Sequence, residues 1–465
     1  MDNRFKEYLK ILRHSDFLYD VSKTTMEDVE SQSEKTYSLT FAPIMVSYVV
    51  WLLSQAKKQK IKRLYFLARD AYPMYEIAKS LKDANLLEME IDIRYLRVSR
   101  YSLRLPEYHL QKEKCLDQIF LSGIDVSLYR ILKRGGLSME EMKQVCRELH
   151  YEKELHDVLN RSQILQLKKQ AYQMCKDGSL SLLDMIMKHS KKRFLSTIGY
   201  LKQEGMLDGT SFAVVDSGWV GSIQKSLRNL LKTQQPGIMV RGYYFGLYEL
   251  PKEHSGCEYS AFYFGPTEHI RRKAGFSNCL FETIFSENCG MVKHYKKTEE
   301  GYEPILSQIE NPNGKLLEEN HKVLQKYIKN IQKNRNGFYQ YFHHIGDKEI
   351  KIVEQICSKL MSHPTNWEAE FYGSCMFSDD LDDSHMKKAA NELSQKEIRD
   401  LRVSSKLLIA LGLSKKVIHE SAWIEGTIVN GRQHISMNLF FARFAKIMTY
   451  IRQTIKMKRF EEVNV

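Results

Sequence analysis

Two segments of the chain share one pattern of hydrophobic and polar positions. In each, a short apolar run leads into a loop with an acidic residue, and the apolar positions then recur every three or four residues. The apolar runs are residues 63–67 and 212–215, and the helical spacing follows at 72–81 and 223–230. Short apolar runs are typical of buried strands, and the longer spacing is typical of amphipathic helices. The sequence therefore predicts two strand–loop–helix units.

Further apolar runs extend these units to a sheet. Residues 91–98 and 237–247 predict two more strands, one after each helix. Strands that alternate with helices of this length form parallel sheets, and ligands gather at the carboxyl ends of such strands. We therefore predict an α/β fold with a Rossmann-like parallel sheet. Four polar residues are expected at its carboxyl edge: Asp70, Ser99, Arg100 and Asp216.

The rest of the chain has mostly helical periodicity. Residues 106–205 predict a helical insertion between the two parts of the α/β core, 58–105 and 206–300. Residues 1–57 predict an N-terminal helical segment that packs on the core, and residues 301–465 predict a mainly helical C-terminal region. At 465 residues, the chain is long enough for this core and its helical additions.

Two apolar segments could contact a membrane. The run at 39–56 is interrupted by Pro43 and by polar residues, which favours a core helix with the proline in its first turn. The helix predicted at 440–460 has an apolar stripe with basic residues around it and no acid among them. The stripe is Phe440, Phe444, Ile447, Met448, Ile451 and Ile455. Docking on an anionic membrane surface and docking on the protein's own core both explain this stripe.

Composition and charge narrow the class of protein. Apolar residues make up 43% of the chain and aromatic residues 11%, which excludes a disordered protein. The eight cysteines form no C-x-x-C pair and the N-terminus has no signal-peptide pattern, so we expect a cytoplasmic protein, with contact at the inner face of the membrane as an addition. The excess of 70 basic over 57 acidic residues favours anionic partners. Nucleic acid is disfavoured, because the one segment that resembles a helix-turn-helix carries three glutamates, Glu140, Glu141 and Glu148.

The segment from Asp216 to Ser222 has the composition of a phosphate-binding loop. A strand that ends in Asp, Gly, Gly and Ser directs backbone N–H groups at an anion, and the next helix adds its dipole. The alternative for Asp216 is an N-cap on that helix. Arg69 and Asp70 could likewise form a structural ion pair. Glu282 lies in an apolar run, which predicts a raised pKa and a general acid or base, although a structural salt bridge would also account for it.

Several blocks resemble a bacterial family of predicted HAD-superfamily hydrolases encoded among surface-polysaccharide genes. The run from Arg63 to Tyr72 resembles the family signature YFLARDGY, with Ala71 in place of the usual glycine. Similar blocks are found at 95–100, 215–224, 280–282 and 423–426. HAD chemistry needs two aspartates in a D-x-D arrangement after an apolar strand. Asp380 and Asp382 have this spacing, but they fall in an acidic cluster typical of a solvated turn.

The order of the same blocks also resembles a type I phosphoribosyltransferase. In that resemblance, 66–72 matches the pyrophosphate loop, 98–101 the loop that closes over the site, and 214–222 the sugar-phosphate loop, although Ser217 replaces the second of two acids. Together the blocks imply catalytic Asp70, Asp216 and Glu282, with Mg²⁺ held by Asp70 and Asp216. The phosphate and substrate ligands they imply are Arg69, Ala71, Ser99, Arg100, Ser217, Gly218, Gly221, Ser222 and Gln224.

These observations predict an enzyme that binds a phosphorylated or pyrophosphorylated sugar, or a nucleotide sugar. Its expected role is glycosyl or phosphoribosyl-like transfer in bacterial surface-polysaccharide synthesis, with Mg²⁺ to neutralise the pyrophosphate. Two alternatives stay open. One is a HAD-like phosphoester hydrolase, and the other is a non-catalytic partner of a glycan-synthesis complex at the membrane.

Overall fold

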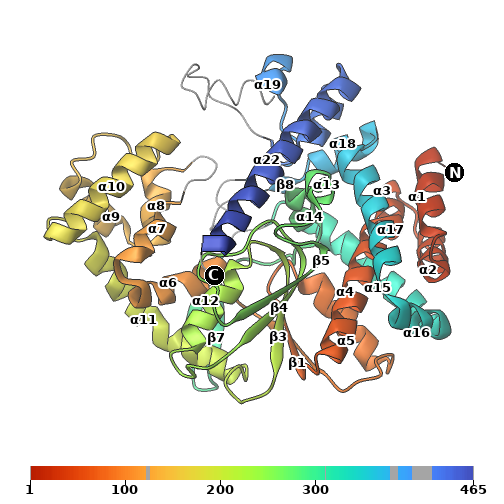
Figure 1. Cartoon of the computed structure of the whole chain (residues 1–465), viewed down its shortest axis with the longest axis horizontal. Helices are drawn as coiled ribbons and strands as arrows, with labels where there is room; N and C mark the ends of the chain where they lie inside the picture. The colour runs from red at the N-terminus through yellow and green to blue at the C-terminus, as the bar shows by residue number, and fades with distance from the viewer. Residues whose placement is uncertain (1, 122–125, 309–310, 378–385, 401–420, 464–465) are drawn as a thin grey trace.

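The centre of the molecule is a parallel sheet of five strands (Figure 1). The computed structural model describes residues 2–121, 126–308, 311–377, 386–400 and 421–463. The strands are β1 (Arg63–Leu67), β2 (Asp92–Leu96), β3 (Phe212–Trp219), β4 (Val240–Leu247) and β5 (Cys257–Phe264). Their order is β2-β1-β3-β4-β5, and every neighbouring pair is parallel. The predicted α/β class with a parallel sheet is therefore confirmed.

The strand predictions differ in accuracy. β1 has the predicted bounds, and its helix α5 (Tyr72–Asp83) extends slightly beyond the predicted 72–81. β2 and β4 lie inside their predicted ranges. β5 was not predicted, because its first half is partly exposed at the edge of the sheet and does not form a continuous apolar run.

β3 continues further than its apolar run. Asp216, Gly218 and Trp219 pair with Tyr244, Gly246 and Leu247 of β4, so the strand includes the residues predicted as a loop. The pairing with β4, which the apolar run does not reveal, extends the strand. The N-cap of helix α12 (Ser222–Leu231) is Gly221, which has a φ of 66° and provides no side-chain cap. Asp216 is therefore not the N-cap of this helix.

One face of the sheet is covered by the N-terminal helices and part of the C-terminal region (Figure 1). These elements are α1 (Asn3–Leu12), α2 (Asp16–Glu27), α3 (Gln32–Leu39), α4 (Phe41–Lys58), α15 (Gly314–Lys333), α16 (Arg335–His344), α17 (Asp347–Cys357), η2 (Ser358–Ser362) and α18 (Asn366–Gly373). α4 packs against the sheet through Tyr48, which contacts the rings of Phe245 and Phe262. Pro43 lies in its first turn, and the predicted core helix is confirmed.

One described stretch is long and apolar enough to cross a membrane. It is Gln32–Lys58, and 89% of its apolar window is buried inside the protein. A core helix of this composition passes the same test of length and hydropathy.

Alternation along the strands divides the core into two layers. In β1, Leu64 and Phe66 belong to the core beneath α4, whereas Tyr65 and Leu67 belong to the core on the other face. Successive strand residues point to opposite faces, which produces this division. The second face is covered by α11 (Leu182–Gln203), α12 and the hairpin β6 (Val292–Lys297) and β7 (Tyr302–Leu306).

A helical lobe extends from the carboxyl side of β2 (left in Figure 1). It consists of α6 (Arg100–Gln111), η1 (Lys112–Lys114), α7 (Cys115–Ile119), α8 (Leu128–Arg134), α9 (Met139–Glu148), α10 (Arg161–Asp177) and α11. Its helices bury their own hydrophobic cluster, from Leu105 to Ile186. Residues 98–101 do not form a closing loop as predicted, because Ser99 caps α6 and helix starts at Arg100.

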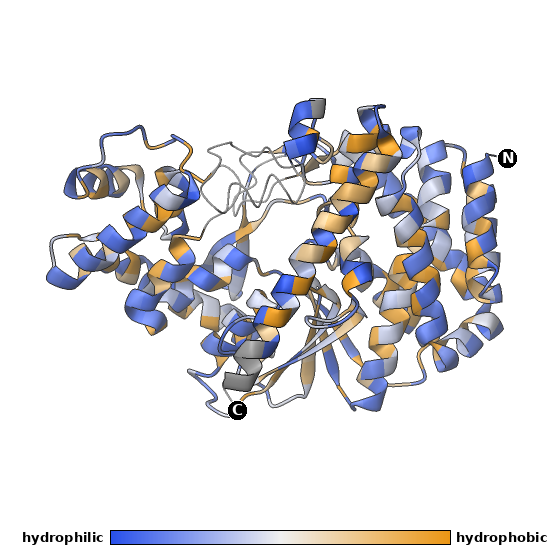
Figure 2. Ribbon diagram, turned by 45° about the horizontal axis from the view of Figure 1, so that its top comes forward, coloured by the Kyte–Doolittle hydropathy of each residue, from blue (hydrophilic) through white to orange (hydrophobic). Residues whose placement is uncertain are grey.

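The remaining elements lie mainly at the carboxyl edge of the sheet. They are α13 (Ile270–Ala274), α14 (Asn278–Ile284), β8 (Met376–Phe377), β9 (Lys387–Lys388), α19 (Gln395–Asp400), α21 (Ile424–Asn430) and α22 (Ile435–Val463). Figure 2 shows α22 along the outside of the molecule, in front of the sheet. Helices predominate among the described residues after β7, while the acidic cluster with Asp380 and Asp382 lies outside the described residues.

The approach of β3 to β4 depends on the absence of a side chain at Gly218. Its φ of 117° is disfavoured for other residues, and a Cβ there would overlap the carbonyl oxygen of Gly246. We expect Gly218→Ala to lower the free energy of unfolding by about 3 kcal/mol or more, from strain and overlap together. Urea unfolding of the full chain measures this loss.

Gly178→Ala is the matched control for this prediction. Gly178 has a φ of 80°, but no atom of the described residues lies within 4 Å of the position of its Cβ. The Gly178→Ala substitution should lower the free energy of unfolding by only about 1–2 kcal/mol, from backbone strain alone. Equal losses in the two variants would contradict the close approach of the strands.

Candidate functional site

The sheet changes its winding direction between β1 and β3. From β1 the chain moves outward to β2, and it later returns to add β3, β4 and β5 on the other side. Ligands of open α/β sheets bind outside the carboxyl ends of the strands at such a point. Asp70 follows β1 closely, and Asp216 lies near the carboxyl end of β3.

The two turns meet at this edge. The Ser217 hydroxyl donates a hydrogen bond to the Asp70 carboxylate at 3.3 Å, between residues that are 147 positions apart in sequence. Each turn also contains one non-glycine residue with left-handed backbone, Arg69 with a φ of 70° and Trp219 with a φ of 73°. Such backbone conformations cost free energy and cluster at functional sites.

The β1 turn is held from two directions. The Arg69 N–H donates to the Tyr95 hydroxyl oxygen at 3.3 Å, and the Tyr95 hydroxyl donates to the Glu287 carboxylate at 2.6 Å. The Glu287 N–H in turn donates to the Arg69 carbonyl oxygen at 3.1 Å. Arg97 completes this support with an ion pair to Glu287 at 3.0 Å. These contacts fix the position of Asp70 before any ligand binds.

Asp216 is a carboxyl group that the protein keeps partly neutral. Burial, and after it the negative charge of Asp70, raises its pKa to about 8, although the Ser217 N–H and Arg100 act in the opposite direction. The Tyr48 hydroxyl donates to the Asp216 carbonyl oxygen at 3.0 Å and to that of Tyr243 at 2.7 Å, so α4 supports the backbone of β3 here.

Glu282 of α14 is a third carboxyl group at this edge. Together with Asp70 and Asp216 it forms what we call the carboxyl cluster. Burial, and after it the charge of Asp70, raises its pKa to about 8, while Arg100 and the indole N–H of Trp219, which donates to its carboxylate, lower it. This rise in the pKa of Glu282 agrees with the prediction made from the apolar residues around it in sequence. Burial and like charge therefore favour the protonated form of Asp216 and of Glu282 beside Asp70.

Basic groups reach the cluster from α6. Arg100 is exposed, and its charge lowers the pKa of both Asp216 and Glu282. One helical turn later, the Arg104 guanidinium donates to the Ser222 hydroxyl at 3.0 Å. Ser222 is the first residue of α12, so a guanidinium, a hydroxyl and the N-terminus of a helix lie together.

Several predicted site residues are therefore brought together. Asp70, Asp216, Ser217, Glu282 and Arg100 interact with one another. Gly218 and Gly221 shape the backbone between the strand and α12, and Ser222 lies at the start of that helix. Arg69 belongs to the β1 turn.

The other predicted residues have structural contacts. Ala71 is buried, and its N–H donates to the Leu67 carbonyl oxygen. The Ser99 hydroxyl caps α6 and donates to the Val292 carbonyl oxygen at 2.6 Å. The Gln224 amide is buried, donates to two backbone carbonyl oxygens and accepts from the Tyr244 hydroxyl. These contacts give the three residues a structural role around the carboxyl cluster.

Sequence reasoning missed two residues of the site, Arg104 and Trp219. Arg104 follows Arg100 by four positions, so a helix beginning at Ser99 would have placed both on one face. The pattern Ser99-x-x-Ser102 marks this helix start, since the two side chains cap each other's backbone N–H groups. The bond from Trp219 to Glu282 joins distant segments, and no local sequence signal predicts it.

A cavity of about 460 Å³ adjoins the β1 turn. Tyr72 and Pro73 line it from α5, Glu287 from the segment after α14, and Asn320 and His321 from α15. The Asn320 Nδ2 is buried and has no hydrogen-bond partner within the described parts of the chain. Glu287, which lines the cavity, also holds the Arg69 backbone, so the cavity lies beside the turn that carries Asp70.

Among the described residues, no group of three or more His, Cys, Asp and Glu side chains could hold a metal ion. Two carboxylates from adjacent strands are nevertheless a donor set that Mg²⁺ uses together with substrate phosphates. No protein-family model and no curated protein matches the chain.

The raised pKa values predict how stability depends on pH. Asp216 and Glu282 bind protons more tightly in the folded than in the unfolded chain, so their contribution is complete below about pH 4 and is lost as the pH rises through about 8. In Asp216→Asn, one of these carboxyl groups is replaced by an amide that does not titrate. The melting temperature of the variant relative to wild type should therefore rise between pH 5 and pH 9, by on the order of 2–4 °C.

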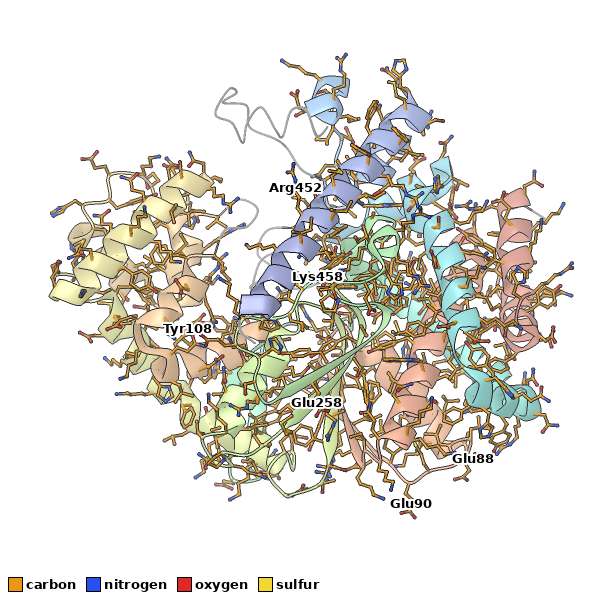
Figure 3. The ribbon with its side chains drawn as sticks, viewed as in Figure 1. Glu88, Glu90, Tyr108, Glu258, Arg452 and Lys458 are labelled. Carbon is orange, nitrogen blue, oxygen red and sulfur yellow. The ribbon has the colours of Figure 1, made fainter. Side chains whose placement is uncertain are left out.

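Glu90→Gln is the control for this measurement. Glu90 is exposed and lies at the opposite edge of the molecule, near Glu88 (Figure 3). Its melting curve should follow that of wild type at each pH. A parallel pH profile for Asp216→Asn and wild type would contradict the raised pKa of Asp216.

Proposed function

We propose that this protein is an enzyme that binds the phosphate or pyrophosphate of an activated sugar and transfers the glycosyl group. The observation that carries the proposal is the carboxyl cluster, in which burial and Asp70 raise the pKa of Asp216 and Glu282. A buried carboxyl group with a raised pKa can hold a proton near neutral pH and act as a general acid or base. A structural ion pair would have no need of three acids.

The residues divide into two roles. The neutral carboxyl group of Asp216 or Glu282 would donate a proton to the leaving oxygen as its bond to the sugar breaks. The other of the two, as a carboxylate, would accept the proton that the acceptor hydroxyl loses, and the Asp70 carboxylate would stabilise positive charge on the sugar ring. Arg100, Arg104 and the N-terminus of α12 would bind the phosphate. The neighbouring cavity of about 460 Å³ has room for the remainder of the substrate.

Mg²⁺ fits this proposal as a partner of the substrate. Asp70 and Asp216 would hold it with oxygen ligands, and its charge would neutralise a bound pyrophosphate. Its binding would also favour the charged form of Asp216, because a cation near a carboxyl group lowers its pKa.

Two resemblances in sequence support the finer assignment. A phosphoribosyltransferase-like fold is favoured by the meeting of the β1 and β3 turns, which are the segments that match the pyrophosphate and sugar-phosphate loops. A HAD-like hydrolase would need a second aspartate two positions after Asp216, where this chain has Gly218. The bacterial surface-polysaccharide context comes from the family resemblance alone, whereas the expected cytoplasmic location comes from the cysteine pattern and the N-terminal sequence.

The proposal predicts distinct effects for the two roles. Phosphorylated sugars, nucleotide sugars and phosphoribosyl pyrophosphate are tested with Mg²⁺ by calorimetry and by assays for transfer and for phosphate release. Arg104→Ala should weaken binding by about tenfold or more, through the loss of a charge-assisted hydrogen bond. Glu282→Gln should lower turnover by about 10²–10⁴-fold and leave affinity within a few-fold of wild type, because Glu282 is assigned neither to the phosphate nor to Mg²⁺.

Glu90→Gln is again the control, and it should match wild type in both measurements. Release of inorganic phosphate without transfer would replace the transferase proposal with the hydrolase. Failure of every phosphorylated sugar to bind would contradict the site itself and favour the non-catalytic partner.

A further inference from the structure

Helix α22 packs against the protein with one face. Tyr450 stacks on Tyr248, with ring centroids 5.3 Å apart, and the Gln453 side chain donates to Glu249 at 3.1 Å. Lys446 bridges both carboxylate oxygens of Glu425 in α21, at 2.7 and 2.9 Å. These contacts fix the helix along the carboxyl side of β4.

Another face of α22 exposes large apolar side chains to solvent. The exposed fractions are 46% for Met437, 66% for Phe440, 46% for Phe444 and 48% for Ile455. At about 100° per residue, these four side chains fall within an arc of roughly 60°, on the side away from Lys446 and Gln453. Such a stripe along an exposed helix marks an interaction site.

Basic side chains border this apolar stripe. At the same 100° per residue, exposed Arg452 and partly exposed Arg443 lie about 60° from the two edges of the stripe, and exposed Lys458 lies at one edge. Figure 3 labels Arg452 and Lys458 beside the helix. No Asp or Glu occurs between Ile435 and Lys458. Basic charge on both borders of an apolar stripe is complementary to the headgroups of an anionic bilayer.

We propose that this face of α22 lies on the surface of a bilayer that contains anionic lipid. The apolar stripe enters the boundary of the acyl chains, and the basic residues contact the headgroups. The segment from Ile435 to Lys458 is about 36 Å long, at 1.5 Å per residue, which suits a flat surface better than a pocket. Bilayer binding by α22 does not depend on the proposed catalytic function.

Binding through this face of α22 would place the bilayer close to the candidate site. Tyr248 contacts Tyr450 of α22 on one side and Trp219 of the site on the other, with ring centroids 5.3 and 5.9 Å apart. A bilayer bound to α22 therefore lies near the carboxyl edge of the sheet. A substrate or acceptor attached to the membrane would reach the protein from this side.

Sedimentation of the full chain with lipid vesicles tests the proposal. The vesicles are pure phosphatidylcholine, or phosphatidylcholine with about 30% phosphatidylglycerol, an anionic lipid. Wild type should bind the anionic vesicles, and binding should fall at high salt, because headgroup attraction is screened. Phe440→Ser with Phe444→Ser, and separately Arg452→Glu with Lys458→Glu, should each weaken binding at least about tenfold.

Lys315→Glu with Lys329→Glu is the matched control for charge. Both lysines are exposed on α15, and the pair changes the net charge as much as the pair on α22 does. This control should bind like wild type. All variants alter exposed or partly exposed side chains, so melting temperatures close to that of wild type verify that each is folded.

Three results would overturn the proposal. The first is a failure of wild type to sediment with anionic vesicles. The second is an equal loss of binding in the α15 control and in the charge variant on α22, which would show attraction without a specific face. The third is a dimer, detected by light scattering, that Phe440→Ser with Phe444→Ser dissociates, which would assign the face to a second copy of the chain.

Discussion

The parallel pairing of β1 with β3 is the constraint on which the rest of the structure depends. Its register places Phe66 opposite Val215, and it joins strands that are separated in sequence by β2 and the whole helical lobe. Because both strands run in one direction, both turns leave the sheet at the same edge, and Asp70 meets Ser217 there. An antiparallel pairing would send the turns to opposite edges and leave no cluster.

The carboxyl cluster is unfavourable by itself, so the surrounding packing must maintain it. Asp70 acts on Asp216 and Glu282 through like charge, and Arg100 opposes it from an exposed position. The stabilising free energy comes from the two hydrophobic layers on either side of β1, which alternate along that strand. The protonated carboxyl groups then lower the cost of the cluster, because a neutral acid needs little solvation.

The elements predicted well from sequence are those that a local pattern specifies. The strand at Arg63–Leu67 and the helix after it need only a run of apolar residues and a change of spacing. The last residues of β3 are polar or glycine and become strand only through β4, so the apolar run ends too early. The predicted strand order is enough to infer that the two turns meet. The hydrogen bond from Trp219 to Glu282 could not be inferred, because it joins segments that are distant in sequence. The stripe on α22 is visible in sequence, but only contacts such as that of Tyr450 show which face packs on the protein.

A chain of aromatic side chains connects α22 with Glu282 of the candidate site. Tyr248 touches Tyr450 and Trp219, and Trp219 donates its indole hydrogen to Glu282. A shift of α22 that moves Tyr450 acts on Tyr248, and so on the group that holds Glu282. By linkage, any effect of a bound surface on ligand affinity must equal the effect of the ligand on surface affinity.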